Sequence, residues 1–278
     1  MRIVLTGGGT AGHVIPNFAV IEELKNCGGG AQLLYIGSKD GVEKAMVEKI
    51  GISYRGVSCG KFRRYFSFKN FVDIFKVPIG VLQARKILRE FKPDVVFSKG
   101  GFVSVPTVLA AHWLKIPVIL HESDAVPGLA NRICARYAKK ICISFEETKK
   151  YLVEYGSSVV FTGNPVRKSI LTGDAEAGYK FTGLDKYRPV VLIMGGSQGA
   201  LQINNLVTAS LDELLKKFQI VHIRGRGNLD ISLHKNGYAQ YEYLDEQLKD
   251  IYAMCELIVT RGGANSLAEI ALLKKKAL

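Results

Sequence analysis

His13 follows a glycine-rich loop and is the first candidate for acid–base chemistry. The segment GGGTAGHV (residues 7–14) comes directly after a short apolar run and before a longer helical pattern. A neutral imidazole at the mouth of such a loop can accept a proton from an attacking hydroxyl group. A structural histidine that caps the following helix would have the same spacing. The pattern alone leaves both roles open.

A second group of polar side chains follows a later apolar run, in HESDAVPG (residues 121–128). This segment carries an imidazole and two carboxylates, Glu122 and Asp124, at the expected carboxyl end of a strand, where open α/β sheets bind ligands. No other residues complete a metal-ligand spacing, so polar contacts to a substrate are favoured over a metal site. The alternative is an ordinary turn in which Asp124 bonds its own backbone.

Three glycine-rich junctions connect an expected strand to an expected helix, at residues 7–12, 195–200 and 261–266. Glycine lets a ligand approach the backbone, and the free N–H groups at the start of a helix favour an anion. Each junction could therefore hold a phosphate. Three in one chain predict a large phosphorylated ligand bound between two domains.

The first junction fits neither of two common nucleotide motifs. Its glycines satisfy Gly-x-Gly-x-x-Gly, but the second strand ends in Gly37-Ser38 without the acidic residue that holds a cofactor ribose. Spaced as a P-loop, it places His13 and Val14 where lysine and Ser or Thr belong. These departures argue against a nicotinamide dehydrogenase and against an ATPase.

Glu269 lies a few residues into the helix that follows the third junction. A carboxylate there suits a ribose diol, because it can accept hydrogen bonds from two hydroxyl groups. An acidic residue near a helix N-terminus also favours the helix dipole, which is the alternative explanation.

Apolar runs of strand length alternate with longer helical patterns, as in the βαβ units of a parallel sheet. In the first half, we expect strands at 3–6, 32–36, 95–98 and 118–121 and helices at 16–25, 42–50 and 105–114. The alternation restarts after Gly163-Asn164-Pro165, with strands at 190–194 and 257–260 and a helix at 201–217. The sequence thus predicts an α/β protein of two domains, residues 1–162 and 163–278.

Composition narrows the class of protein. The 278 residues are 47% hydrophobic and 23% charged, and no apolar run approaches the ~18 residues of a membrane-spanning helix. The first apolar stretch is too short for a signal peptide, so a cytoplasmic location is expected. Five scattered cysteines without a Cys-x-x-Cys pair argue against a disulfide framework and a zinc site.

The net charge of +13 is concentrated in the first domain. Residues 1–162 hold 23 basic and 13 acidic side chains, whereas residues 163–278 hold 15 and 12. Six of the 26 aromatic side chains fall in residues 62–75, among basic ones. Such a segment could bind single-stranded nucleic acid or an anionic membrane surface. The alternative is that Phe68, Phe71 and Phe75 form one buried stripe of a helix.

Six segments together resemble the MurG family of bacterial peptidoglycan glycosyltransferases. They occur in the family's order and span nearly the whole chain. They are GGGTAGHVIPNFAV (7–20), FSKGGFVSVPTVLAA (97–111), HESDAVPGLANR (121–132), TGNPVR (162–167), GGSQGALQIN (195–204) and TRGGANSLAEI (260–270).

The resemblance implies a GT-B fold, with two Rossmann-like domains built on parallel sheets, the second of them incomplete. It implies an inverting transfer of N-acetylglucosamine from UDP-N-acetylglucosamine to the lipid-linked muramyl-pentapeptide, the step from lipid I to lipid II. Residues 1–162 would bind this acceptor and the membrane, and residues 163–278 would bind the UDP-sugar. No cofactor, metal ion or nucleic acid is implied.

The resemblance also implies roles for individual residues. His13 is the candidate general base, with Glu122 as its rival. Ser197 and the helix start at Ala264 would contact the donor diphosphate, and Leu244 would contact the uracil through its backbone. The residues expected at the substrates are Thr10, Ala11, Gly12, Asp124, Arg167, Ser197, Gln198, Leu244, Ala264, Asn265, Ser266, Leu267, Ala268 and Glu269.

A membrane-binding surface on the cytoplasmic face of the bacterial membrane is implied as well. Phe102 and Trp113 could extend it. Its expected contact residues are Phe62, Arg63, Arg64, Phe66, Phe68, Phe71 and Phe75.

The chain departs from the family pattern in two places. Asp124 stands where some members have an amide that contacts the sugar. After Leu278, the family continues with a strand, a glutamine-bearing loop and a helix, so a C-terminally truncated copy is expected. A UDP-sugar isomerase of the same architecture and a catalytically inactive membrane-binding copy remain alternatives.

Overall fold

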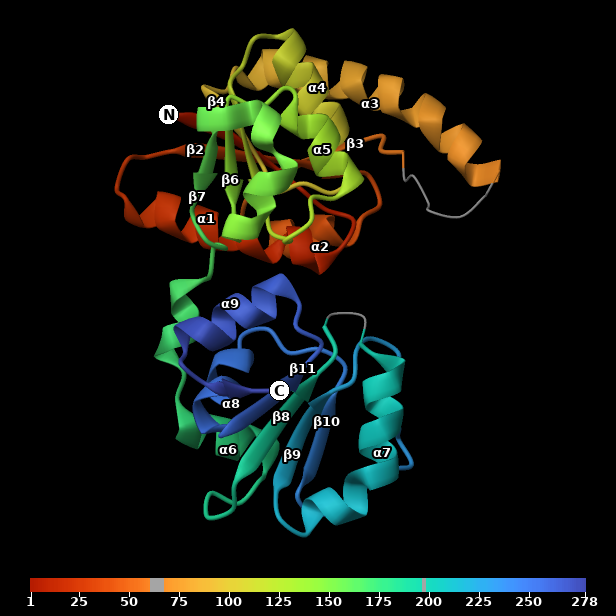
Figure 1. Cartoon of the computed structure of the whole chain (residues 1–278), viewed down its shortest axis with the longest axis vertical. Coiled ribbons are helices and arrows are strands. Elements are labelled where there is room, and N and C mark those ends of the chain that lie inside the picture. Colours follow the sequence, from red (N-terminus) through yellow and green to blue (C-terminus); the bar gives the residue numbers. More distant parts are fainter. Residues whose placement is uncertain (61–67, 197–198) are drawn as a thin grey trace. The chain divides into compact units, whose positions relative to one another are not determined.

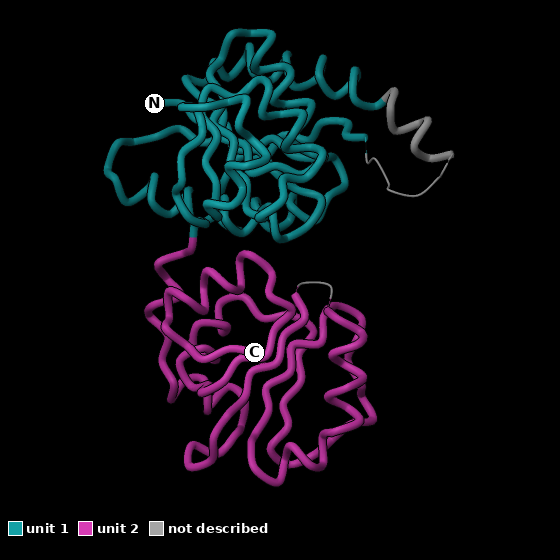
Figure 2. Tube along the Cα trace, viewed as in Figure 1, with its two compact units in different colours: residues 1–165 teal, residues 166–278 magenta. Residues whose placement is uncertain are grey.

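The chain forms two compact units, unit 1 (residues 1–165) and unit 2 (residues 166–278), shown in Figure 2. The computed structural model describes residues 1–60, 68–196 and 199–278, with the backbone alone for residues 68–75. Each unit is built on one parallel sheet with helices packed against it (Figure 1). The predicted α/β class with two parallel sheets is confirmed.

Within its described residues, unit 1 has a seven-stranded parallel sheet in the order β3-β2-β1-β4-β5-β6-β7. The strands are β1 Arg2–Thr6, β2 Gln32–Ser38, β3 Ser53–Val57, β4 Val95–Ser98, β5 Val118–Glu122, β6 Lys140–Ile143 and β7 Val159–Phe161. The helices are α1 Ile15–Asn26, α2 Val42–Lys49, α3 Phe68–Phe91, α4 Val105–Trp113 and α5 Leu129–Ala135, with 3₁₀ segments η1 Ala11–His13, η2 Glu146–Tyr151 and η3 Val153–Ser158.

Helices cover both faces of the unit 1 sheet, which explains why its central strands contain continuous apolar runs. On one face, Val4 of β1 belongs to the same core as Leu88 of α3 and Val108 of α4. On the other face, Ile3 and Leu5 belong to a core shared with α1 and α2. The alternation of neighbouring residues between two cores fixes the register of β1.

Unit 2 repeats this plan with a five-stranded parallel sheet among its described residues, in the order β10-β9-β8-β11-β12. Its strands are β8 Val190–Met194, β9 Gln219–Ile223, β10 Tyr238–Tyr241, β11 Leu257–Thr260 and β12 Lys276–Ala277. Its helices are α6 Ala175–Thr182, α7 Leu201–Leu215, α8 Leu248–Met254 and α9 Ala264–Leu272, preceded by the 3₁₀ segment η4 Lys168–Thr172.

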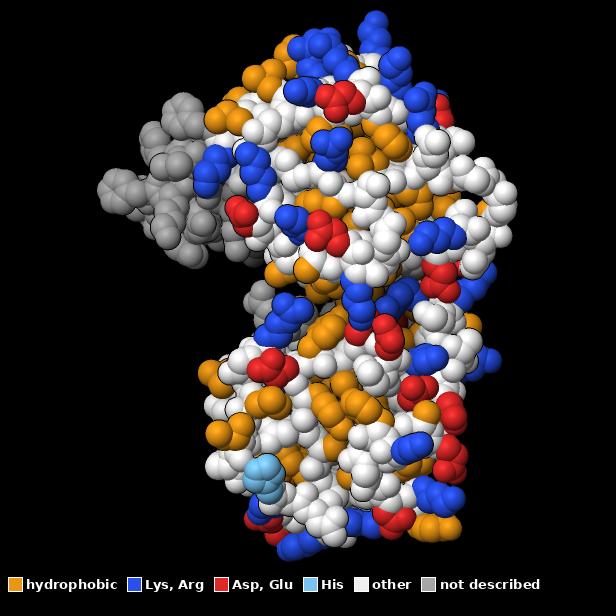
Figure 3. All heavy atoms as spheres, turned by 180° about the vertical axis from the view of Figure 1, so that it is seen from behind, with side chains coloured by type: hydrophobic (Ala, Val, Ile, Leu, Met, Phe, Trp, Pro, Cys, Tyr) orange, Lys and Arg blue, Asp and Glu red, His pale blue; other side chains and the backbone are white. Residues whose placement is uncertain are grey.

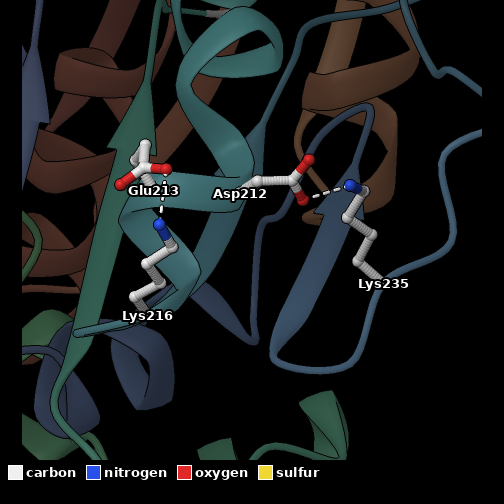
Figure 4. A network of polar contacts seen from close by, with 4 residues as sticks. All are labelled: Asp212, Glu213, Lys216 and Lys235. Carbon is white, nitrogen blue, oxygen red and sulfur yellow. Dashed lines mark hydrogen bonds and ion pairs between the residues drawn. The ribbon is translucent and has the colours of Figure 1, made fainter.

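The outer side of α7 carries exposed ion pairs. Lys216 Nζ lies 2.6 Å from Oε1 of Glu213, which is one helical turn earlier. Lys235 pairs with Asp212 (Figure 4). Exposed pairs of this kind contribute about 0–1 kcal/mol each. This side of unit 2 is therefore a charged, solvated surface.

In both sheets the strand order reverses beside the first strand of the unit. In unit 1, β2 lies on one side of β1 and β4 on the other, and in unit 2, β9 and β11 flank β8 in the same way. The loops that leave the carboxyl ends of such strands diverge, and open α/β sheets bind ligands at that point. The topology thus predicts one site after β1 and β4 and another after β8 and β11.

Candidate active site

The first site begins where β1 and β4 end at the same level. Thr6 pairs with Ser98, and the Lys99 amide donates to the Thr6 carbonyl over 2.9 Å. The loops that begin at Gly7 and Lys99 therefore lie side by side. Phe102, which is half-buried, packs against the first of these loops at Gly9.

His13 ends η1 and lies against the loop that follows β4. Its ring Cδ2 is 3.0 Å from the position that a Cβ on Gly101 would take, at a φ of +79°, so the imidazole occupies space that only glycine leaves open. Its buried Nδ1 has no hydrogen-bond partner among the described residues, so this atom does not cap α1. Burial and the Lys99 charge lower the pKa of His13, although Asp124 opposes them. The lowered pKa favours the neutral imidazole, which also makes a hydrogen bond to the Lys99 backbone.

The three residues before His13 differ in exposure. Thr10 and Gly12 are exposed, whereas Ala11 is buried. The His13 amide donates to the Thr10 carbonyl over 3.1 Å, which closes this turn. Substrate contacts expected for this loop fit Thr10 and Gly12 better than the Ala11 side chain.

Glu122 organises the loop after β5. Its buried carboxylate accepts from the Asp124 amide (2.9 Å), the Gly128 amide (3.3 Å) and Asn131 Nδ2 (2.8 Å). Burial raises its pKa, and these hydrogen bonds oppose the rise. Asp124 is exposed at the loop surface, while Thr148 donates to its carbonyl oxygen over 3.2 Å. The geometry assigns Glu122 to loop structure and leaves Asp124 facing solvent.

Lys99 is a site residue that the sequence analysis missed. Its side chain is 1% exposed, and its Nζ is 2.8 Å from His121 Nδ1 and 3.3 Å from Asn164 Oδ1 and also donates to Ser123 Oγ. Burial lowers its pKa to about 8. The available signal was a lysine placed directly after an apolar strand and before two glycines. Lysine is rarely fully buried in a protein unless its charge is paired.

In unit 2, the loop after β8 is held close to the end of β9. A Cβ on Gly199, at a φ of +76°, would lie 2.0 Å from the Arg224 carbonyl oxygen, so glycine is required there. Asn204 of α7 donates to the same carbonyl over 2.9 Å. Ser197 and Gln198, predicted to contact the donor, lie outside the described residues.

A buried polar network supports this loop from below. His222 lies 3.1 Å from Asn204 Oδ1 through Nε2 and 3.0 Å from the Tyr238 hydroxyl through Nδ1. Because Asn204 donates through Nδ2, its Oδ1 accepts from Nε2, and Nδ1 accepts from Tyr238. Arg224 Nη1 in turn donates to the Tyr238 oxygen over 3.2 Å. Burial and Arg224 lower the pKa of His222 to about 4, so the network is built on a neutral imidazole.

The start of α9 presents backbone N–H groups of the kind that bind anions. The helix begins at Ala264 after an exposed turn, and its N-cap residue Gly263 has no side chain that could cap the helix. The first amides of a helix have no partner within the helix and carry its positive dipole end. Ala264, Asn265, Ser266 and Ala268 are half-buried and Leu267 is exposed, so the expected contacts of this segment are made most readily by its backbone.

Glu269 lies deeper in α9 than a terminal position. It is 8% exposed, and the Tyr252 hydroxyl donates to its Oε2 over 3.0 Å. Burial raises its pKa, and the Tyr252 hydrogen bond and the Arg167 charge oppose the rise. A hydrogen bond within unit 2 therefore already engages one oxygen of the carboxylate predicted to hold a ribose.

Arg167 acts on this carboxylate through its charge, and Leu244 lies in the core of unit 2. Arg167 Nη1 is 3.2 Å from Asp245 Oδ1, in a partly buried ion pair. The Leu244 side chain is buried in the core of unit 2, which leaves only its backbone for a ligand. Leu244 and Asp245 follow β10, so the ion pair holds Arg167 beside the segment after this strand.

The predicted membrane surface is described only in part. Phe62, Arg63, Arg64 and Phe66 lie outside the described residues, and only the backbone of Phe68, Phe71 and Phe75 is placed, in α3. Further along α3, Ile79 and Leu82 are exposed, and the Arg85 guanidinium lies 4.2 Å from the ring centre of the exposed Trp113. Lys86 and Arg89 are exposed on the same helix.

On the face shown in Figure 3, Lys and Arg side chains gather over unit 1 and alternate with Asp and Glu over unit 2. No described helix is long and apolar enough to span a bilayer.

Family models match both units. Residues 3–143 match the glycosyltransferase family 28 N-terminal domain, and residues 190–278 match the glycosyltransferase family 28 C-terminal domain. The chain is 50% identical over its 278 residues to the UDP-N-acetylglucosamine–N-acetylmuramyl-(pentapeptide) pyrophosphoryl-undecaprenol N-acetylglucosamine transferase of Lachnospira eligens, and covers 77% of that protein. It is 49% identical to the enzyme of the same name from Clostridium tetani, and covers 76% of it.

Solved structures share the architecture. MurG of Acinetobacter baumannii superposes with a TM-score of 0.67 at 25% identity, over 97% of this chain and 74% of that one. A UDP-GlcNAc 2-epimerase of Neisseria meningitidis, solved with UDP-GlcNAc bound, gives a TM-score of 0.66 at 16% identity, over 100% of this chain and 81% of that one. The second likeness shows the fold alone.

Proposed function

The chain belongs to glycosyltransferase family 28, and we infer that it transfers N-acetylglucosamine from UDP-N-acetylglucosamine to the lipid-linked muramyl-pentapeptide, converting lipid I to lipid II in peptidoglycan synthesis. The observation that carries this function is the 50% identity to a transferase of that name along the whole chain. The chain is therefore a hexosyltransferase that acts in building the cell wall.

The reaction requires a proton acceptor and a stabiliser of the leaving group. A hydroxyl oxygen of the acceptor sugar forms a bond to C1 of N-acetylglucosamine, the bond from C1 to the phosphate oxygen breaks, and UDP leaves with the electron pair. One displacement at C1 inverts its configuration. His13, whose pKa is lowered by burial and by Lys99, takes the hydroxyl proton in this proposal.

Unit 2 is the proposed donor-binding unit. The start of α9 provides N–H groups and a dipole end for the diphosphate, and Arg167 adds a positive charge close by. Ser197 completes the diphosphate contacts and Gln198 also binds the substrate. Glu269 holds the ribose hydroxyls, and the Leu244 backbone contacts the uracil. These groups balance the charge of departing UDP without a divalent ion.

A transfer assay tests the function directly. The full-length protein should move labelled N-acetylglucosamine from its UDP carrier to a lipid-linked muramyl-pentapeptide, with release of one UDP per sugar transferred. The matched control omits the acceptor. Conversion of the UDP-sugar in that control would instead support an isomerase, the activity named for the epimerases of similar fold. Binding of the acceptor lipid without turnover would contradict the inference.

We propose further that unit 1 binds the cytoplasmic face of the cell membrane as a peripheral protein. Support comes from the exposed apolar residues Ile79, Leu82 and Trp113, which lie beside basic residues of α3. The residues of 62–75 predicted at the membrane extend this surface in the proposal. Apolar side chains enter the interface, while Lys and Arg are attracted to anionic lipids.

Neutralising α3 should weaken membrane binding. Each basic side chain near an anionic membrane contributes ~1 kcal/mol, so replacing Arg85, Lys86 and Arg89 with Gln should weaken binding to phosphatidylglycerol vesicles about 100-fold. Vesicle co-sedimentation at 0.1 M salt measures the change. The control replaces exposed lysines of unit 2 with Gln, at Lys180, Lys186 and Lys217. Equal weakening by both triple variants would show that net charge, rather than this surface, governs binding.

A further inference from the structure

Lys99 is a buried cation at the carboxyl edge of unit 1, and each of its three ammonium hydrogens has an acceptor. His121 Nδ1 is 2.8 Å from its Nζ, Asn164 Oδ1 is 3.3 Å away, and Ser123 Oγ is in contact. A lysine ammonium has three donors and no acceptor. The protonated Lys99 ammonium therefore donates a hydrogen bond to each of the three acceptors. A neutral amine has only two hydrogens and leaves one acceptor without a donor.

The protonation of His121 follows from its neighbours. Its Nε2 is 2.9 Å from the Gly163 carbonyl oxygen, which can only accept, so Nε2 carries the hydrogen. Nδ1 is then the acceptor for Lys99. Burial and the Lys99 charge hold the pKa of His121 at about 3, so this imidazole stays neutral. Lys99 thus connects, through His121 and directly through Asn164, to the segment that ends unit 1.

Lys99 also packs against the loop that carries His13. The position of a Cβ on Gly7 would be 3.1 Å from Lys99 Cβ and 2.9 Å from the His13 carbonyl oxygen. The charged or titratable groups that face Lys99 are Glu122 and Asp124 from the loop after β5, His121 from β5, and Cys142 from β6. The groups that act on His13 are Lys99 and Asp124. Lys99 is therefore the positive charge that opposes protonation of His13.

We propose that Lys99 is a positioning residue for the transfer reaction, whose buried ammonium ties the loop after β5 and the segment before unit 2 to the His13 loop and keeps the His13 imidazole neutral. The proposal rests on the proposed function and on His13 as its base. Lys99 does not touch the substrates and acts through His13, Ser123 and Asn164.

The pH dependence of turnover should report this role. Below the pKa of His13 the base is protonated and turnover falls. Because the Lys99 charge lowers this pKa, the acidic limb of the pH–rate profile lies at a lower pH than it would without Lys99. Above about pH 8 Lys99 loses its proton, one acceptor loses its donor, and turnover falls again. The variant Lys99→Met keeps the length of the side chain without the charge. It should move the acidic limb to higher pH and abolish the limb near pH 8.

The test measures initial rates of the full-length protein from pH 4 to 10. Lys99→Met should lower kcat roughly 10-fold through misplacement of the loop, and leave the KM for UDP-N-acetylglucosamine within about twofold. Lys139→Met, at an exposed lysine of unit 1, is the matched control and should keep the wild-type profile. A Lys99→Met profile of unchanged shape, whatever its height, would overturn the proposal.

A second measurement needs no variant. In the wild-type protein, the ring resonances of His13 should shift once below pH 6.5 and a second time near pH 8, when Lys99 titrates. A single shift would contradict the coupling even if Lys99→Met does not fold. If the wild-type protein binds UDP but transfers no sugar, the proposed function fails, and the resonance titration still decides whether Lys99 controls the protonation of His13.

Discussion

Replacing His13 with alanine is expected to lower kcat for sugar transfer by about 10²–10⁴-fold, the usual contribution of a general base. The KM for UDP-N-acetylglucosamine should change little, because the donor is proposed to bind unit 2. The variant should fold, since its imidazole Nδ1 makes no hydrogen bond among the described residues. Initial rates at saturating substrates measure the effect, and circular dichroism checks the fold.

The exposed His234 provides the control. A His234→Ala variant should keep wild-type turnover. The acidic limb of the wild-type rate should have an apparent pKa below the ordinary 6.5, because burial and Lys99 disfavour the protonated imidazole. Undiminished turnover in His13→Ala would remove His13 from this role. Glu122 would then be the remaining candidate, despite the three hydrogen bonds that hold its carboxylate in the loop.

The strongest elements were predictable because buried parallel strands are continuous apolar runs. The strand predicted at 190–194 has the same bounds as β8. The strands predicted at 3–6 and 118–121 are each one residue shorter than β1 and β5. The structure divides the chain after Pro165, within the TGNPVR segment. The glycine junctions were visible for a local reason, since tight turns at strand ends need glycine.

Elements that depend on distant partners were not predictable. β3, with the sequence SYRGV, has exposed positions and forms only because β2 offers it an edge. The polar residues Ser53 and Arg55 give it no apolar run. In unit 2, β9 and β10 were not predicted either, and both contain polar residues, Gln219 and His222 in β9 and Gln240 in β10.

Buried polar partners were also beyond the reach of sequence patterns. Lys99 and His121 meet because β4 and β5 are neighbours with a fixed register, and no spacing along the chain encodes that pairing. The same holds for Glu269, which was assigned to a ribose by its place in a helix. Only the packing of α8 against the sheet shows that Tyr252 bonds to it.

Replacing Glu269 with alanine is expected to weaken UDP binding about 100-fold. The ribose hydroxyls would lose hydrogen bonds to a charged acceptor, each worth ~1.5–3 kcal/mol, and 2.7 kcal/mol corresponds to a factor of about 100. Calorimetric titration of UDP into the full-length protein measures the change. Because burial raises the pKa of Glu269, binding should begin to weaken at a higher pH than for an ordinary glutamate as the solution is acidified.

The Tyr252 hydrogen bond decides between a ribose-binding and a purely structural carboxylate. If Glu269 binds ribose, Tyr252→Phe should cost about 1 kcal/mol of unfolding free energy and change UDP affinity less than threefold, because the carboxylate remains. If Glu269 serves only to pair with Tyr252, both variants should lose stability and both should bind UDP as the wild type does. Glu256→Gln, at an exposed glutamate of unit 2, controls for the lost charge. A large separation in UDP affinity between Glu269→Ala and Tyr252→Phe, with similar losses of stability, therefore identifies the buried carboxylate as a ligand for the donor.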